Sequence, residues 1–350
     1  YTTIAIAAAI PAVLYFSAIY FSIDCYARAN GLNPMPREEV PRARDVLLSA
    51  SALPAFGPLL LLAYLLFNGY TPTLAGAVAT IAMLALAAGV RIFACISEGR
   101  VGDLGREMRE LARKIWEGFV DGGRGVIIIA ALLATAALLV TVLSASGLGV
   151  KFSQLLLGFS GDILIGVLLI SAALCIMLGM DVPTTASYLL TASVAAPALT
   201  KLGLPPLGAH LFIFYFAILS AITPPVCASV YAAATIVQEN FWKVAGQALR
   251  IAGAVFFIPF MMVYRPAILM QGTWPEIIYN VAITWFAVAA ICGGSIGYLL
   301  GPVSWPLRIW LYVAGASLFY PSIYADVTGV AMLALFVAWQ LVRARQHRTA

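Results

Sequence analysis

The chain is dominated by long apolar segments that follow one another with few charges inside them. A helix that crosses the ~30 Å hydrocarbon core of a bilayer needs about 20 apolar residues. None of the segments alternates polar and apolar residues, as the strands of an outer-membrane barrel do. The sequence therefore predicts an all-α, polytopic helical membrane protein. The apolar segments are residues 4–23, 49–67, 73–95, 126–145, 162–180, 183–200, 207–237, 249–270, 277–300, 305–321 and 325–342.

The charged residues lie between these apolar segments. The net charge of +5 would on its own suit a nucleic-acid-binding protein. The cations are instead concentrated in the connections, as expected from the excess of Lys and Arg in the cytoplasmic loops of membrane proteins. We therefore expect a lipid bilayer and no nucleic acid as partner. The three cationic segments placed in the cytoplasm are residues 28–44, 91–114 and 343–348.

Catalytic and nucleotide-binding motifs give little support to an enzyme. The sequence has no H-E-x-x-H motif and no Walker loop, and its five cysteines are scattered, so we expect no use of ATP, no metal cluster and no disulfide. Gly293–Gly297 matches the nucleophile pattern G-x-S-x-G. The predicted helical context and the scarcity of His, with only His210 and His347, favour helix packing through glycine instead. An intramembrane hydrolase and an ion channel stay rival predictions.

Two consecutive prolines interrupt the apolar segment 207–237, in the stretch SAITPPVCASVY that begins at Ser220. Pro224 and Pro225 remove backbone donors and free carbonyls about one turn earlier, near Ser220. In hydrocarbon such unpaired groups are costly, so a bound solute or ion is expected to satisfy them. Together with the Thr223 hydroxyl, the carbonyls form an oxygen cluster suited to Na⁺ near the bilayer midplane. The alternative is a kinked helix whose Thr and Ser hydroxyls cap their own backbone.

A second interruption lies in LGMDVPTTASYLL, residues 178–190. Asp181 lies there between two long apolar segments, and an ionisable residue in such a place indicates a functional site. The rival interpretation is an acid at a helix end that caps the next helix, for which a proline in the first turn is well suited. The neighbours that interrupt or cap a helix are Gly179, Pro183, Thr184, Thr185 and Ser187.

A Ser-Gly turn occurs in TVLSASGLGVKF, residues 141–152, between two apolar pieces that are short for full spans. This favours a re-entrant hairpin that reaches the middle of the membrane, and a full span followed by an ordinary loop is the alternative. The residues of its predicted tip are Ser144, Ser146, Gly147 and Gly149.

We expect three regions along the chain. Residues 1–121 form scaffold or arm helices and include an amphipathic helix at 98–123 that lies at the membrane interface, with a surface linker helix as the alternative. Residues 122–240 hold the hairpin and the interrupted helices of a transport domain. Residues 241–350 form C-terminal scaffold and additional membrane spans, with Trp and Tyr at their ends.

The segment GMDVPTTASYLLTASVAAPALTKLGLPPLGAHLFIFYFAILSAITPPVCASVYAAATI resembles the second half of the large membrane subunit of TRAP (tripartite ATP-independent periplasmic) transporters. The stretches GLNPMPREEVPRARD, GYTPTLAG, SGLGVKF and PFMMVYRPAILMQG resemble the same family, over nearly the whole chain. The fused type that works with TAXI binding proteins is the most similar class. TAXI-type members more often have GMGLPTTA where this chain has GMDVPTTA, so Asp181 departs from their pattern.

The resemblance implies secondary active import of small organic acids (carboxylates) across a bacterial or archaeal cytoplasmic (inner) membrane. A Na⁺ or H⁺ gradient drives it, with no covalently bound cofactor, and the fold is an elevator of inverted repeats with hairpins and broken helices. The implied partners are a periplasmic solute-binding protein of the TAXI type and a small membrane subunit, separate or fused upstream. Carried over by motif, the cation-binding residues are Ser220, Thr223, Pro224, Ser144 and Gly147, with Na⁺ at Ser220 and Thr223; the substrate-binding residues are Asp181, Pro183, Thr184, Thr185 and Ser146.

Only the second of the family's two inverted repeats is recognisable in the sequence. The chain also begins at Tyr1, without a methionine or a basic signal region before the first apolar segment. We therefore expect a part upstream of these residues, and we expect that residues 1–350 alone do not transport.

Overall fold

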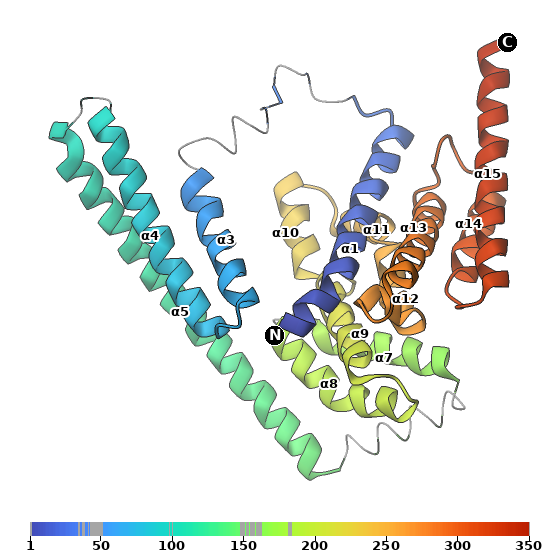
Figure 1. The fold of residues 1–350 in the computed structure, drawn as a ribbon, viewed down its shortest axis with the longest axis horizontal. Coiled ribbons are helices and arrows are strands. Elements are labelled where there is room, and N and C mark those ends of the chain that lie inside the picture. Colours follow the sequence, from blue (N-terminus) through green and yellow to red (C-terminus); the bar gives the residue numbers. More distant parts are fainter. Residues whose placement is uncertain are drawn as a thin grey trace. The chain divides into compact units, whose positions relative to one another are not determined.

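The computed structural model describes residues 2–33, 52–97, 101–147, 163–180 and 184–349, with a few single positions between these ranges. The described residues form helices and turns, and an isolated β-bridge joins Tyr298 to Pro302 (Figure 1). This confirms the predicted all-α membrane fold. In chain order the elements are α1 (Thr2–Ala29), α3 (Ala52–Phe67), α4 (Pro72–Ser97), η1 (Val101–Asp103), α5 (Leu104–Ala145), α7 (Leu164–Gly179), α8 (Thr184–Lys201), α9 (Pro206–Leu219), η2 (Ser220–Ile222), α10 (Ala228–Val237), α11 (Phe241–Ile251), η3 (Val255–Phe257), α12 (Ile258–Tyr264), η4 (Pro266–Leu269), α13 (Trp274–Ile296), α14 (Trp305–Ser317) and α15 (Ile323–Thr349).

The chain divides into two compact units. The first comprises Tyr1–Ala5 and Pro34–Ala130, and the second comprises Ile6–Asn33 and Ala131–Ala350. The three functional regions expected from the sequence concern roles along the chain and stay a prediction.

The first unit is built around the hairpin of α3 and α4. Gly69 has a φ of +84°, a left-handed conformation that glycine adopts without strain, and it lets the chain reverse between the two helices. The first part of α5 lies beside α4, where Arg91 pairs with Glu107 at 3.3 Å. The amphipathic segment and the following apolar segment form one unbroken helix, α5, so the expected boundary at residue 121 falls inside a helix.

The second unit has its core where α7, α8 and α9 pack against one another and against α12. Leu168, Leu199 and Phe212 are fully buried there, and α1 contributes Leu14 and Ala18 to the same cluster. Large apolar side chains bury the most surface and stabilise such a core most.

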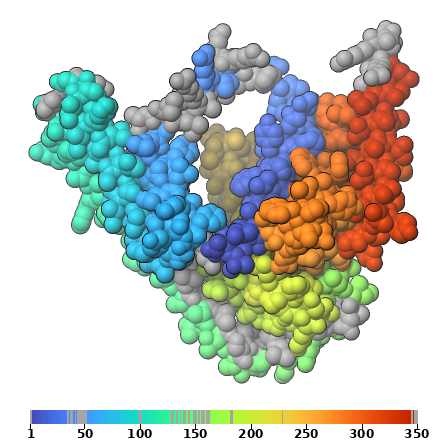
Figure 2. Space-filling model, in the orientation of Figure 1, coloured from blue at the N-terminus to red at the C-terminus, as the bar shows by residue number. Residues whose placement is uncertain are grey.

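Helix α1 also packs along α13, and the two lie beside each other in Figure 2, in blue and orange. Phe21 of α1 contacts Trp285 of α13 edge to face, with 5.6 Å between the ring centroids. This contact fixes the N-terminal helix of the chain on the C-terminal part of the same unit.

Two apolar segments are interrupted, one of them where the sequence predicts a break and one where it does not. The segment 207–237 divides into α9, η2 and α10, with the break at the cis-linked Pro224–Pro225 pair. The segment 249–270, predicted as a plain span, bends by 58° between α11 and the helical piece Val255–Tyr264, which consists of η3 and α12. The prediction of a plain span there was wrong, because Gly253 lies at the bend and lets the Ser295 side chain approach the backbone.

Within the described residues, four helices are long and apolar enough to cross a membrane, and the bent pair would be a fifth. Helix α14 has 13 residues, fewer than the about 20 that a membrane-spanning helix needs. The predicted span at 305–321 is therefore too short to cross the membrane as one helix. The four long helices are Thr2–Ala29, Pro72–Ser97, Trp274–Ile296 and Ile323–Arg343; shorter apolar helices are Ala52–Phe67, Leu164–Gly179 and Pro206–Ile222.

Candidate functional site

The ends of two interrupted helices meet at Ser220. This residue follows α9 and is 2% exposed. Its Oγ lies 3.0 Å from the carbonyl oxygen of Gly179, at the end of α7, and 2.7 Å from that of Ala217. A hydroxyl has one proton, which it donates to one of these carbonyls, and its lone pairs stay open to a donor or a cation. The first and second predicted interruptions therefore lie in contact.

A second hydroxyl, from Ser187 of α8, lies at the same place. Ser187 is fully buried, and its Oγ has no hydrogen-bond partner among the described residues. A Cβ added to Gly179 would lie 2.5 Å from the Ser220 Oγ and 2.6 Å from the Ser187 Oγ, so both hydroxyls contact the glycine backbone. We call Gly179, Ser187 and Ser220 the serine junction.

Thr223, directly before the two prolines, bonds to carbonyls of its own segment. The Thr223 hydroxyl donates to the Leu219 carbonyl at 2.8 Å, and the Thr223 N–H donates to the Ser220 carbonyl at 3.2 Å. These bonds match the alternative in which Thr caps its own backbone. Each carbonyl oxygen keeps a second lone pair, so the predicted cation ligation by Ser220, Thr223 and Pro224 stays a prediction.

The predicted hairpin tip begins where α5 ends. Ser144 lies in the last turn of α5, the Ser146 N–H donates to the Val142 carbonyl at 2.9 Å, and Gly147 has a φ of +67° that suits a turn. Ser146 is exposed. Gly149 lies outside the described residues, so a re-entrant hairpin stays a prediction.

The structure describes only some of the predicted substrate-binding residues. Thr184 and Thr185 are the first residues of α8 and both are exposed. Asp181 and Pro183 lie outside the described residues. The sequence named Ser187 as part of this interruption but did not assign it to the cation or the substrate site. Its position pointed to the site, because Ser187 lies two residues after Thr185 in the same short polar stretch.

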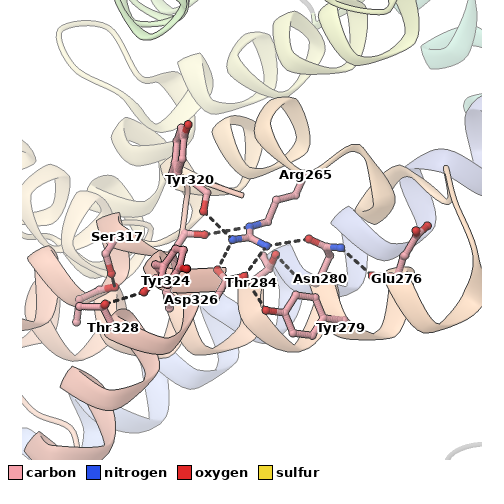
Figure 3. Close-up of polar contacts among 12 residues, drawn as sticks. Arg265, Glu276, Tyr279, Asn280, Thr284, Ser317, Tyr320, Tyr324, Asp326 and Thr328 are labelled. Carbon is pink, nitrogen blue, oxygen red and sulfur yellow. Dashed lines mark hydrogen bonds and ion pairs between the residues drawn. The ribbon is translucent and has the colours of Figure 1, made fainter. Parts of the chain in front are cut away.

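A buried charged cluster lies elsewhere in the second unit, around Arg265 (Figure 3). Arg265 is 3% exposed, and it forms an ion pair with Asp326 of α15. Its guanidinium also donates to Asn280 of α13 at 2.9 Å and to two backbone carbonyls, those of Leu318 and Tyr320, each at 3.0 Å. This is the contact set that sequence reasoning missed.

The cluster is fully satisfied. With two bonds to Asp326, the five N–H donors of the Arg265 guanidinium all have acceptors. The Tyr279 hydroxyl donates to Asp326 at 2.7 Å. An ionisable residue within membrane helices often marks a transport path, but here no donor of Arg265 is left for a solute. The cluster therefore joins the end of α12 to α13, to α15 and to the connection between α14 and α15.

Gly293–Gly297 packs helices, as predicted. A Cβ at Gly293 would meet Leu299 and Leu311 at 3.2 Å, and one at Gly294 would lie 3.3 Å from the Arg308 carbonyl oxygen. The Ser295 Oγ lies 3.1 Å from the Tyr312 hydroxyl. In the described part of the chain, no group of three or more His, Cys, Asp or Glu is placed to hold a metal ion.

These features define a class: a polytopic helical membrane protein with interrupted helices, whose freed backbone groups and hydroxyls are buried together, as in secondary transporters. Residues 1–277 match the family model described as "Tripartite ATP-independent periplasmic transporter, DctM component", and the chain therefore belongs to the TRAP transporter large-component family. No curated protein and no solved structure matches the chain. The family match ends within α13, so α14 and α15 lie beyond it.

Proposed function

We propose that this TRAP transporter component imports small organic acids by coupling their movement to a Na⁺ or H⁺ gradient. The observation that carries the proposal is the serine junction, where two interrupted helices bring hydroxyl and carbonyl oxygens together inside the bundle. Backbone carbonyls and hydroxyls are the ligands that Na⁺ takes in broken-helix transporters. The Ser187 hydroxyl, buried without a partner among the described residues, leaves one such ligand unused.

In this proposal the cation is held by Ser220 and Thr223, beside Pro224, with Ser144 and Gly147 of the hairpin tip completing the ligands. We add Ser187 to this set because its hydroxyl lies against the same glycine backbone as that of Ser220. Cation ligation at these oxygens would compensate the polar groups that the breaks bury in hydrocarbon.

The substrate carboxylate is proposed to bind at the start of α8. Thr184 and Thr185 occupy its first positions, where backbone N–H groups and the helix dipole favour an anion. Asp181, Pro183 and Ser146 complete the proposed set. The solute is delivered by a periplasmic binding protein, proposed to be of the TAXI type, and a small membrane subunit completes the complex in a bacterial or archaeal inner membrane.

The test is uptake by the complete transporter with its binding protein, measured against Na⁺ concentration at fixed pH and against pH without Na⁺. Ser220→Ala removes a proposed ligand without adding bulk. We expect a rise of about tenfold in the half-saturating cation concentration, as loss of a ligand worth ~1.4 kcal/mol gives. Thr223→Val should act in the same direction.

Ser295→Ala is the matched control, because its hydroxyl pairs with Tyr312 and takes no part in the serine junction. Its cation dependence should equal that of the unchanged protein. An unaltered Na⁺ and pH dependence in both Ser220→Ala and Thr223→Val would contradict the cation site. Solute flux that persists without the binding protein would favour the rival channel.

A further inference from the structure

A polar hollow of about 230 Å³ lies among the ends of four helices of the second unit. The last turn of α1, the polar face of α11, the end of α13 and the start of α14 surround it. The polar side chains that line it are Tyr26, Asn30, Gln247, Arg250, Tyr298 and Arg308. It is separate from the serine junction, and it is completed by residues beyond the family match.

The hollow carries two positive charges and no acid among its lining residues. Within the described part of the chain, neither Arg250 nor Arg308 pairs with a carboxylate; the nearby Asp24 pairs with Arg28 at 2.9 Å. Two guanidinium groups that line one small hollow without a carboxylate partner attract an anion to it.

The Arg308 side chain is held in place from three sides. Its Nε donates to the Val303 carbonyl at 3.3 Å, and its Cζ lies 6.0 Å from the centroid of the Trp305 ring. The guanidinium also lies against Gly297, where an added Cβ would overlap it. The Val303 carbonyl accepts from the Nε–H, one of the five N–H donors of the guanidinium. The N–H groups of the two terminal nitrogens remain to bind an oxyanion.

Gln247 adds a second, independent indication of a ligand. Its Oε1 is buried and has no hydrogen-bond partner among the described residues. The oxygen and nitrogen of an amide are assigned from their partners, so either an acceptor or, after a flip, a donor lacks a partner at the hollow. The phosphate oxygens of a phosphate ester accept hydrogen bonds from Arg and, if the amide is flipped, from the Gln247 NH₂ group. If the amide is not flipped, a hydroxyl of the esterified alcohol can donate to the Gln247 Oε1.

We propose that this hollow binds a phosphate group, carried by the headgroup of an anionic lipid or free in solution. Trp305, at its edge, is 69% exposed, and exposed Trp residues mark the headgroup level of a bilayer. The hollow lies at the Arg28 end of α1, which the charge distribution places in the cytoplasm. Basic pockets between helices on that side bind lipid phosphates.

The test is the thermal unfolding midpoint of the purified full chain in a neutral detergent. Three probes separate the sources: inorganic phosphate, short-chain phosphatidylglycerol, and short-chain phosphatidylcholine, whose phosphate is neutralised by its own cation. We expect phosphatidylglycerol near saturation to raise the midpoint by about 3 °C. Arg308→Gln and Arg250→Gln should each abolish most of this shift.

Arg343→Gln is the matched control, because Arg343 also lies over a Trp ring, that of Trp339 at 5.4 Å, but outside the hollow. It should keep the full shift. A shift with both phosphate and phosphatidylglycerol, lost in the hollow variants, supports a general phosphate site; a shift with the lipid alone supports a headgroup site. No shift in the unchanged protein, or an equal loss in Arg343→Gln, overturns the proposal. If Arg308→Gln does not fold, Arg250→Gln and lipid retention measured by native mass spectrometry decide between these outcomes.

Discussion

At the scale of single residues, Gly179 is the position where the candidate site tolerates least change. Its backbone lies against two buried hydroxyls, one from α8 and one from the end of α9. The carbonyl at the end of α7 has lost its place in the helix ladder, and the Ser220 hydroxyl satisfies it. One glycine therefore permits both the close approach of the helices and the hydrogen bond between them.

We predict that Gly179→Ala destabilises the protein by about 1–3 kcal/mol, because its methyl group forces the serine junction apart. Thermal unfolding in detergent measures the effect. Gly246→Ala is the matched control: Gly246 is also helical, and a Cβ there meets nothing within 4 Å. The control should stabilise by about 0.5–1 kcal/mol through helix propensity. Equal effects of the two substitutions would show that packing at Gly179 is unimportant.

At the scale of elements, the helices of the second unit are interrupted where a side chain from another helix reaches their backbone. Ser220 reaches Gly179, and Ser295 of α13 reaches Gly253 between α11 and α12. The break at residues 220–227 also carries Cys227 at a φ of +31°. Such breaks in membrane helices persist when neighbouring groups satisfy the backbone. At Gly179 and Gly253 the neighbouring side chain comes from another element, whereas Thr223 bonds to carbonyls of its own segment.

We predict that Gly253→Ala and Ser295→Ala are coupled. Gly253→Ala alone should cost about 1–3 kcal/mol, since the new Cβ collides with the Ser295 hydroxyl. Ser295→Ala alone should cost about 1 kcal/mol or less, for the lost bond to Tyr312. In the double variant the shortest contact, to the Ser295 Oγ, is gone, although the Cβ of residue 295 still lies 3.0 Å away. Unfolding should therefore show an interaction energy of at least about 0.5 kcal/mol. Strict additivity would mean that Ser295 does not constrain the bend.

At the scale of the whole molecule, the part that matches the family is joined to a part that lies beyond the match. Arg265 lies inside the matched residues, whereas Asp326, Tyr320 and Leu318, which bind it, lie after residue 277. A buried ion pair adds little net stability, but a lone buried charge is costly. The two parts therefore depend on each other through this cluster.

We predict that the sign of one substitution reverses with chain length. In the full chain, Arg265→Met should cost about 3–5 kcal/mol, because it leaves Asp326 buried without a cation. In a chain truncated after residue 303, Arg265 has lost Asp326 and two carbonyl acceptors, and the same substitution should raise the unfolding midpoint. Removing both charges in the full chain, by Arg265→Met with Asp326→Leu, should recover most of the loss. A destabilising effect in both lengths would contradict the role of the cluster.

The sequence by itself determined the membrane class, the helical fold, the positions of two interruptions and the packing role of Gly293–Gly297. These follow from local physics: apolar length decides what enters a bilayer, proline removes a donor wherever it stands, and glycine allows close approach. Only the tertiary structure decided that Ser187 joins Ser220, that Arg265 pairs with Asp326, and that Gly253 marks a bend rather than a plain span. These residues are far apart in the chain: Ser187 and Ser220, which both lie against Gly179, are 33 positions apart, and Arg265 and Asp326 are 61 positions apart. Such pairing is set by how the helices pack, which no local pattern of residues encodes.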